Sequence, residues 1–207
     1  MSSVLEIAAS GGKVLALRSV EFARRHGVAL HVRSSFTWES GTWVVEEDEK
    51  MEEAIVSAVT QDTSEAKITV TRVPGKPGIA ASLFWALADE AINVDMIVQN
   101  TSHDGNTDIS FTVPKADFNT SVRVPKSVIP AIGGTEVLAD TDVARVSLIG
   151  VGMRTHPGVT ARIFETLASH YINIEMISTS SIRISCMVRA AVVEETVRGP
   201  HDEFELA

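Results

Sequence analysis

The sequence of 207 residues has little of several features that define common protein classes, and each shortage excludes a class. A single cysteine, Cys186, rules out an internal disulfide and a cysteine-rich zinc site. No apolar run approaches the roughly 20 residues of a membrane-spanning helix, so no membrane association is expected. Basic residues number 18 against 27 acidic ones, and the resulting net charge of −9 argues against a nucleic-acid partner.

The amino-terminal stretch also lacks a charged start followed by an apolar core, which predicts that there is no secretory signal peptide. Hydrophobic residues make up 44% of the sequence and charged residues 22%, as in ordinary globular proteins. A reduced, cytoplasmic protein is therefore expected. Its length allows either one large domain or two small ones, each with a core of its own.

An internal repeat decides between these two possibilities. Residues 77–97 read PGIAASLFWALADEAINVDMI, and residues 157–177 read PGVTARIFETLASHYINIEMI. The two segments share 10 of 21 positions without a gap, at an offset of 80 residues. The sequence therefore contains two copies of one module.

Both copies predict the same order of elements. Alternating, β-branched runs predict strands over 66–73 and 143–151, and each is followed by a Pro-Gly turn into a helix with one apolar face. A new strand is predicted to begin at Asn93 and at Asn173, and each leads into a hairpin. Cys186 falls in the second hairpin and is expected to be a small buried hydrophobic residue.

A second helix is expected after each hairpin, over 116–132 and 192–204. Pro125 and Pro130 interrupt the first of these helices, and the pair Gly199-Pro200 interrupts the second. A proline inside a helix removes a hydrogen bond and costs about 3 kcal/mol. Both helices are therefore predicted to be short or broken.

These elements predict an α+β fold of two ferredoxin-like βαββαβ modules. The first copy closes with a strand over 135–139, whereas the second ends without one. The unassigned strand at 54–61 is given to the second module, which places the first module as an insertion in the second. The predicted domains are residues 66–140 for the first module, residues 54–61 plus 143–207 for the second, and a preceding segment, 1–50.

A βαββαβ module with a Pro-Gly turn into its first helix, present in tandem, resembles the ACT domain. The match is closer still to the regulatory region of aspartate kinases, which SEAKITV, KPGIAASLFWALADEAINVDMIVQN, TDISFTV and VARVSLIGVGMRTHPGVTARIFETLASHYINIEMISTS resemble. Upstream, EIAASGGKVLALRSVEFARRHGVALHVRSSF is similar to the last segment of that family's amino-acid-kinase domain. The resemblance covers essentially the whole chain, and it identifies segment 1–50 as a remnant of the kinase domain.

The family's kinase domain opens with a Lys-Phe-Gly-Gly-type phosphate-binding segment that this sequence does not contain. The stretch Gly11-Gly12-Lys13 is not a P-loop either, since a P-loop needs GxxxxGK[ST]. Phosphoryl transfer requires a phosphate cradle, a positioned metal and an aligned acceptor. No catalytic or metal-binding residue is therefore assigned, and ATP and Mg²⁺ are expected only in a catalytic partner. The sequence resembles the family's regulatory β subunit.

The resemblance implies that free amino acids of the threonine or lysine type bind at interfaces between ACT modules. A zwitterion needs donors for its carboxylate, which a helix start supplies through free backbone N–H groups, and an acceptor for its ammonium, which Asp95 would supply. The implied effector-binding positions are Gly75, Ile79, Ala80, Asn93, Val94, Asp95 and Gln99 in the first module, and Val159, Thr160, Asn173, Ile174, Glu175 and Thr179 in the second.

The same residues have plainer interpretations when they are taken one at a time. Asn93 and Asn173 could simply end helices, because asparagine tolerates the left-handed conformation. Asp95 and Glu175 could be solvated strand charges. The family resemblance is what favours a binding role.

Two positions depart from the family's pattern. Gly75 stands where the family has an aspartate that holds the effector's ammonium group, and Ser181 stands where it has a glutamate. Losing one charge-assisted hydrogen bond costs roughly 1.5–3 kcal/mol, or about 10- to 150-fold in affinity. Weakened feedback by threonine or lysine is therefore expected.

The predicted function is regulation of aspartate phosphorylation in amino-acid biosynthesis, through an effector that favours one arrangement of the partner kinase domains. A homodimer, or a hetero-oligomer with the aspartate kinase catalytic chain, is expected because ACT modules pair edge to edge. Two alternatives stay open. The chain could be the C-terminal portion of an active aspartate kinase completed by a catalytic partner, or a stand-alone ACT amino-acid sensor.

Overall fold

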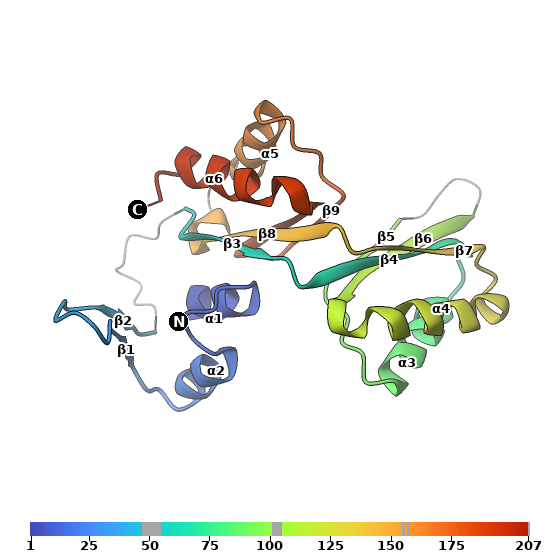
Figure 1. The fold of residues 1–207 in the computed structure, drawn as a ribbon, viewed down its shortest axis with the longest axis horizontal. Helices are drawn as coiled ribbons and strands as arrows, with labels where there is room; N and C mark the ends of the chain where they lie inside the picture. Colours follow the sequence, from blue (N-terminus) through green and yellow to red (C-terminus); the bar gives the residue numbers. More distant parts are fainter. Residues whose placement is uncertain (47–54, 101–104, 155, 157, 207) are drawn as a thin grey trace.

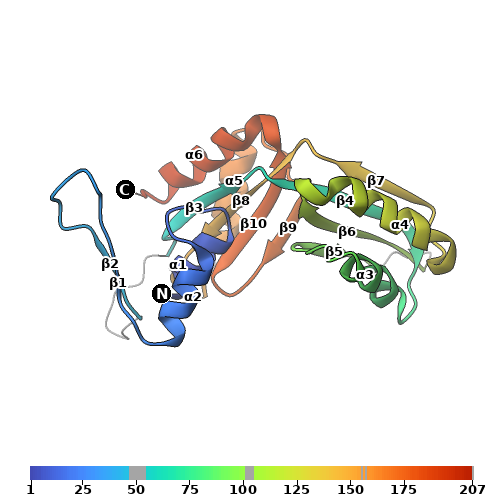
Figure 2. The ribbon, with the colours of Figure 1, turned by 60° about the horizontal axis from the view of Figure 1, so that its bottom comes forward.

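The computed structural model describes residues 1–46, 55–100, 105–154, 156 and 158–206. Two four-stranded antiparallel sheets, each with its own helices, lie side by side, and a small amino-terminal lobe lies next to the second sheet (Figures 1 and 2). This arrangement confirms the predicted α+β class with two ferredoxin-like modules. Ala54, His103 and Pro157 lie outside the described residues.

The first sheet has the strand order β5-β6-β4-β7. Its module comprises β4 (Glu65–Pro74), α3 (Ile79–Asp89), β5 (Ile97–Gln99), β6 (Asn106–Pro114), α4 (Phe118–Ile132) and β7 (Glu136–Asp140). Leu83 and Leu87 of α3 are completely buried and pack with Ile68 and Phe111 of the sheet in one apolar core. The one-sided apolar spacing of the helix thus produces the layer of helices on this sheet.

The second sheet has the order β3-β8-β10-β9. Its elements are β3 (Ala58–Asp62), β8 (Val143–Ile149), α5 (Val159–Ser169), β9 (Met176–Thr179), β10 (Arg183–Arg189) and α6 (Val193–Glu203). β3 precedes the whole first module in the chain, and it pairs antiparallel with β8 in the place that β7 holds in the first sheet. Cys186 is buried as predicted, and burial raises the pKa of its thiol to about 12.

β8 is buried along its whole length, and its two faces contact different parts of the molecule. Val146 and Leu148 belong to the core under α5 and α6. Because side chains alternate along a strand, Arg145 and Ser147 project from the opposite face. A buried charge is thereby placed next to the first module.

The prediction that prolines break the second helices was wrong. α4 continues through Pro125 and Pro130, and α6 continues through Pro200. Each interior proline costs about 3 kcal/mol, but burying one large apolar side chain of the same helix returns roughly 1.5–3 kcal/mol. Several α4 side chains are packed in this way: Phe118, Val122, Val124, Val128, Ile129 and Ile132.

The strands that follow the first helices begin later than predicted, at Ile97 and Met176 instead of Asn93 and Asn173. The residues before each strand are still tied to the neighbouring strand by backbone hydrogen bonds. The N–H of Asp95 donates to Thr112 at 3.1 Å, and the N–H of Glu175 donates to Met187 at 2.8 Å. These linkers therefore hold fixed positions although they are not paired as regular strands.

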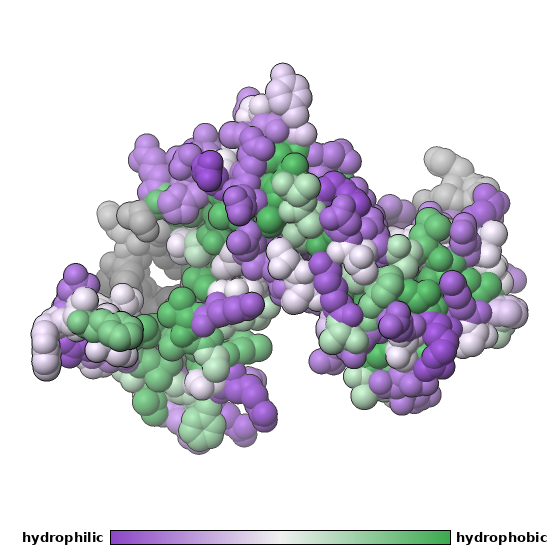
Figure 3. Space-filling view, in the orientation of Figure 1, coloured by the Kyte–Doolittle hydropathy of each residue, from purple (hydrophilic) through white to green (hydrophobic). Residues whose placement is uncertain are grey.

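The amino-terminal lobe contains α1 (Ser2–Ala9), α2 (Leu17–Arg25), β1 (Leu30–Val32) and β2 (Thr42–Val44). It contacts the second sheet through hydrogen bonds such as that from the Thr60 hydroxyl to the Ser10 carbonyl, at 2.9 Å. Exposed apolar side chains gather on this lobe (Figure 3), among them Phe22, Phe36, Trp38 and Trp43. Among the described residues, no helix has both the length and the apolar character needed to cross a bilayer.

Candidate functional site

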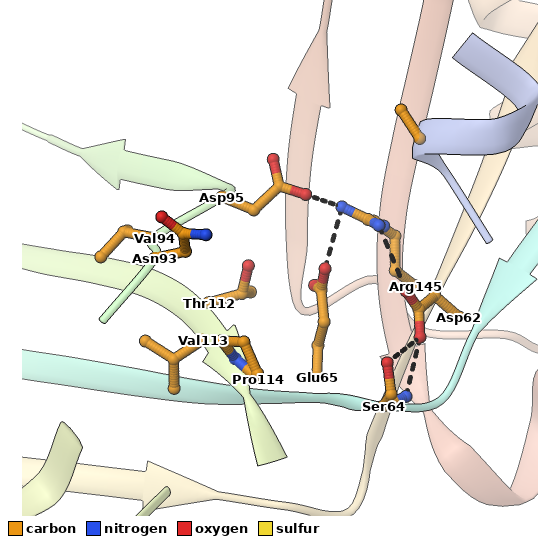
Figure 4. Close-up of a pocket in the computed structure, with 11 residues that line it drawn as sticks. Asp62, Ser64, Glu65, Asn93, Val94, Asp95, Thr112, Val113, Pro114 and Arg145 are labelled. Carbon is orange, nitrogen blue, oxygen red and sulfur yellow. Dashed lines mark hydrogen bonds and ion pairs between the residues drawn. The ribbon is translucent and has the colours of Figure 1, made fainter. Parts of the chain in front are cut away.

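Three of the predicted effector-binding residues, Asn93, Val94 and Asp95, line one pocket of about 360 Å³ at the junction of the two modules (Figure 4). The rest of its lining comes from the crossover between β3 and β4, from β6, from β8 and from α1: Asp62, Ser64, Glu65, Thr112, Val113, Pro114, Arg145 and Ala9. Both modules therefore contribute to a single site within one chain.

Arg145 is the centre of this pocket and is only 2% exposed. Its guanidinium group faces three carboxyl groups (Figure 4): it is ion-paired with Asp95, lies 3.0 Å from Glu65 Oε1, and lies 3.4 Å from Asp62 Oδ2. The planar fork of arginine suits such shared pairing, because its five N–H groups point in several directions. One buried cation thus holds together the crossover, the linker before β5, and β8.

The carboxyl groups of this cluster differ in their proton affinity. Burial raises the pKa of Glu65 to about 7, and Asp95 and Asp62 add to this effect while Arg145 opposes it. Burial also acts to raise the pKa of Asp62, but hydrogen bonds from Ser64 and the charges of Arg145 and Lys13 outweigh it and lower that pKa. Oε2 of Glu65 has no hydrogen-bond partner among the described residues.

The pKa of Glu65 leads to a prediction about pH. This pKa is about 7 in the folded protein and 4.5 in an ordinary glutamate. Between these two pH values the folded state keeps a proton that the unfolded chain has lost. The stabilisation that this proton gives the folded state is complete below pH 4.5 and is lost as pH rises through 7. We expect the free energy of unfolding to fall by roughly 2–3 kcal/mol between pH 5 and pH 8. Urea unfolding should show this fall, and a Glu65→Gln variant that keeps the full fall would contradict the assignment.

The second module contains a matching ion pair, in which the two modules exchange roles. Glu175, the counterpart of Asp95 in the repeat, accepts a hydrogen bond from Lys67 Nζ at 2.9 Å. Lys67 is the third residue of β4, and Arg145 is the third residue of β8. Each module therefore supplies a cation from its first strand to the carboxylate that follows the first helix of the other module.

An apolar cluster accompanies the two reciprocal ion pairs. Met96 and Met176, again one repeat apart, are buried together with Val143 and Met187, and Val98 packs against them. These residues come from the linkers and strands at the junction of the two sheets. The junction thus combines a central apolar contact with the two ion pairs.

The other predicted effector-binding residues lie outside this pocket. Ile79 and Ala80 pack against the first core, and Val159 is buried in the second core. Gly78 and Gly158 cap the two helices with φ of 92° and 97°, and open space surrounds both glycines. The remaining predicted positions contribute nothing to the lining of the pocket: Gly75, Gln99, Thr160, Asn173, Ile174, Glu175 and Thr179.

The structure bears on the plainer interpretation of the two asparagines, that they end the helices. The left-handed position after each helix is held by Ala91, with φ of 57°, and by Tyr171, with φ of 56°. Asn93 and Asn173 follow two residues later, so they do not end the helices in that conformation. Sequence reasoning missed Arg145, Glu65 and Lys67. The one available signal was a basic residue at the same place in both first strands.

Comparison with known proteins agrees with this architecture. A family model for the ACT domain matches residues 68–126 and 146–204, more than half of the chain. The aspartokinase of Corynebacterium efficiens is 46% identical over 207 residues, which cover 98% of this chain and 49% of that protein. The chain thus spans about half the length of the curated relatives that it matches.

Two solved structures show the same fold. The regulatory subunit of aspartate kinase from Thermus thermophilus has 39% identity and a TM-score of 0.69, over 72% of this chain and 99% of that one. The aspartate kinase from Synechocystis has 34% identity and a TM-score of 0.74, over 100% of this chain and 38% of its own. These similarities confirm the resemblance that the sequence motifs indicated.

Proposed function

Because this chain belongs to the aspartokinase family and matches its regulatory portion, we propose that it controls the phosphorylation of aspartate by a catalytic aspartate kinase chain in response to free amino acids. The observation that carries the proposal is the junction pocket, where Asp95 faces a cavity shared by two ACT modules. ATP and Mg²⁺ belong to the catalytic chain in this proposal. The effectors are threonine, lysine or both.

The chemistry of an amino acid assigns roles to the predicted residues. Asp95 accepts hydrogen bonds from the ammonium group, and Asn93 can both donate and accept. The free N–H groups at the start of α3, near Ile79 and Ala80, lie at the positive end of the helix dipole and suit a carboxylate, but they lie outside the junction pocket of the same chain. α5 offers the same groups near Val159 and Thr160.

Dimerisation through the ACT modules is part of the proposal. β5 and β7 end the first sheet, and β3 and β9 end the second. Strands at the ends of sheets carry backbone groups that can pair with another chain. A second copy would bring its helix start to the effector, whose binding would favour one arrangement of the partner kinase domains.

Calorimetric titration with threonine, then with lysine, tests the proposed binding. We expect a saturable heat that Asp95→Asn weakens by about 10-fold or more, because a charge-assisted hydrogen bond is lost. Asp89→Asn serves as the matched control, since Asp89 is an exposed carboxylate at the end of α3. The absence of binding of either amino acid, alone or together, would contradict the proposal.

One observation favours a second candidate function. The amino-terminal lobe exposes large apolar side chains, among them Phe36 at 98% and Trp38 at 97%. Such a surface is typical of a contact with another protein segment. The chain would then complete an active kinase together with a catalytic partner. Formation of aspartyl hydroxamate only after the two chains are mixed would support this candidate.

A further inference from the structure

The outer face of the second sheet, opposite α5 and α6, is polar and is covered by the amino-terminal lobe. Ser147 and Ser185 lie opposite each other on this face, and their hydroxyl oxygens are 2.8 Å apart and completely buried. Thr60 of β3, which pairs with Ser147, donates a hydrogen bond to the carbonyl oxygen of Ser10. The lobe therefore meets this sheet through polar groups, with α1 lying against it (Figure 2).

One ion pair joins α1 to this face. Nη1 of Arg183, at the start of β10, lies 3.2 Å from Glu6 Oε2 and 3.5 Å from Ser10 Oγ. The side chains of Arg183 and Glu6 are only 19% and 27% exposed. Nε of Arg183 is buried and has no hydrogen-bond partner among the described residues. Because these charges are partly removed from water, reversing either one should expel α1 from the face.

The turn after α1 restricts which helix fits on this face. Gly11 has a φ of 105°, and a Cβ added to it would lie 2.3 Å from the carbonyl oxygen of Gln61 in β3. Both the backbone conformation and the lack of space exclude a side chain at this position. The face therefore fits a helix that carries a glutamate, a serine four residues later and then a glycine. A second copy of this chain carries that pattern.

The lobe has a core of its own and is joined to the modules by polar contacts and one linker. Among the described residues, its apolar cluster contains no residue of either module: Met1, Val4, Leu15, Ala23, Leu30, Val32 and Val44. Thirteen residues separate Val44 from Ala58, where the second sheet begins, and a chain of that length spans at most about 45 Å. The lobe can therefore leave this face without losing its own core.

The distribution of charge favours contact between a lobe and a pair of modules. Residues 1–46 contain five basic and four acidic residues, a net charge of +1, whereas residues 55–207 contain 12 basic and 18 acidic residues, a net charge of −6. Two pairs of modules therefore repel each other, and each attracts a lobe. This attraction is the same whether the lobe belongs to the same chain or to another copy.

We propose that the outer face of the second sheet is an exchangeable docking surface for α1, which binds the helix of its own chain or, in a reciprocal dimer, that of a second copy. Exchange of an identical element is a low-cost route to a dimer, because each contact within one chain is remade between two. In the exchanged dimer, Ala9 of each chain lines the junction pocket of the other. The contacts that hold α1 involve none of the proposed effector-binding residues, so the inference stands or falls independently of the proposed function.

Charge reversal separates docking within a chain from docking between chains. Glu6→Arg and Arg183→Glu each bring like charges together, so the amide hydrogens of α1 should exchange about tenfold or more faster than in the wild type. A chain that carries both substitutions restores the pair in itself and should recover the protection. An equimolar mixture of the two single variants can restore the pair only between chains, and we expect it to recover the protection as well. Hydrogen exchange followed by mass spectrometry measures these rates.

The matched control reverses a pair of the same module that lies away from the lobe. Arg162 of α5 and Glu203 of α6 form a surface ion pair, with 47% and 39% of their side chains exposed. Arg162→Glu, Glu203→Arg and their mixture should leave the exchange of α1 within about twofold of the wild type. Two results overturn the inference: single variants at Glu6 and Arg183 that are as protected as the wild type, or a mixture that exchanges as fast as the single variants.

A covalent test covers the case in which a charge-reversed variant fails to fold. Ser10→Cys and Thr60→Cys are introduced into separate chains, which are mixed and oxidised. A disulfide-linked dimer on a non-reducing gel supports the exchange, and its absence overturns the inference. The wild type provides the background, because its only cysteine, Cys186, is buried.

Discussion

Replacing Arg145 by methionine is expected to lower the free energy of unfolding by about 3–5 kcal/mol at pH 8. Methionine fills a similar length of side chain but removes the cation that Asp62, Glu65 and Asp95 share. At pH 8, above the pKa of about 7, Glu65 is mostly ionised in the wild type. Without Arg145 it must either stay as a buried charge with no partner or take up a proton, and both cost stability. Unfolding in urea, followed by circular dichroism, measures the loss.

The dependence of this loss on pH tests whether the charge of Glu65 contributes to it. At pH 5 the Glu65 carboxyl group is protonated, so the same substitution should cost less than at pH 8. Arg123→Met is the matched control, since Arg123 pairs with Glu90 on the surface and both side chains are largely exposed. It should change stability by less than about 1 kcal/mol. An Arg145→Met variant as stable as the Arg123→Met variant would refute the central role of Arg145.

The architecture could be predicted from the sequence because both copies of the repeat show the same order of elements. The match between residues 77–97 and 157–177 placed α3 and α5 correctly to within a residue or two. The second helices were judged by local propensity alone, and there the prediction failed. Tertiary burial of the apolar face of α4 outweighs the cost of Pro125 and Pro130, and burial is not a local property.

The site was only partly accessible from the sequence. Asn93, Val94 and Asp95, which the family resemblance implied, do line the junction pocket, and their binding role stays a prediction. Arg145 and Glu65 were missed, since each is a charged strand residue that meets its partners only when the two modules pack together. Arg145 is 50 residues from Asp95 and 83 from Asp62 in the chain. Periodicity and spacing within one module cannot reveal contacts of that range.

The repeat also conceals a difference that packing creates. Asp95 and Glu175 are equivalent in sequence, yet Asp95 is 46% exposed and lines the junction pocket, whereas Glu175 is 25% exposed and does not line it. Duplication therefore provides two similar modules, and their packing decides which of the two carboxylates faces a pocket. This is why equal sequence patterns do not imply two equal ligand sites.

If a second copy in a dimer brings its Gly75 turn to the effector, an aspartate at Gly75 is expected to tighten threonine or lysine binding by about 10- to 150-fold, the value of one charge-assisted hydrogen bond. The position can accept the side chain. Gly75 is exposed, its φ is not positive, and an added Cβ would lie 3.2 Å from the Gly105 carbonyl oxygen, so a shift of a few tenths of an ångström suffices. Calorimetry of Gly75→Asp against the wild type measures the gain.

The matched control for this gain is Gly75→Asn, which has the same shape and the same backbone effect without the charge. If the family's pattern describes this chain, the aspartate variant binds tightly and the asparagine variant stays near the wild type, because only a carboxylate offsets the charge of the ammonium. Equal affinities of the two variants would mean that Asp95 alone carries the ammonium contact. The weak feedback predicted from Gly75 would then have no physical basis, since the lost aspartate would have contributed nothing.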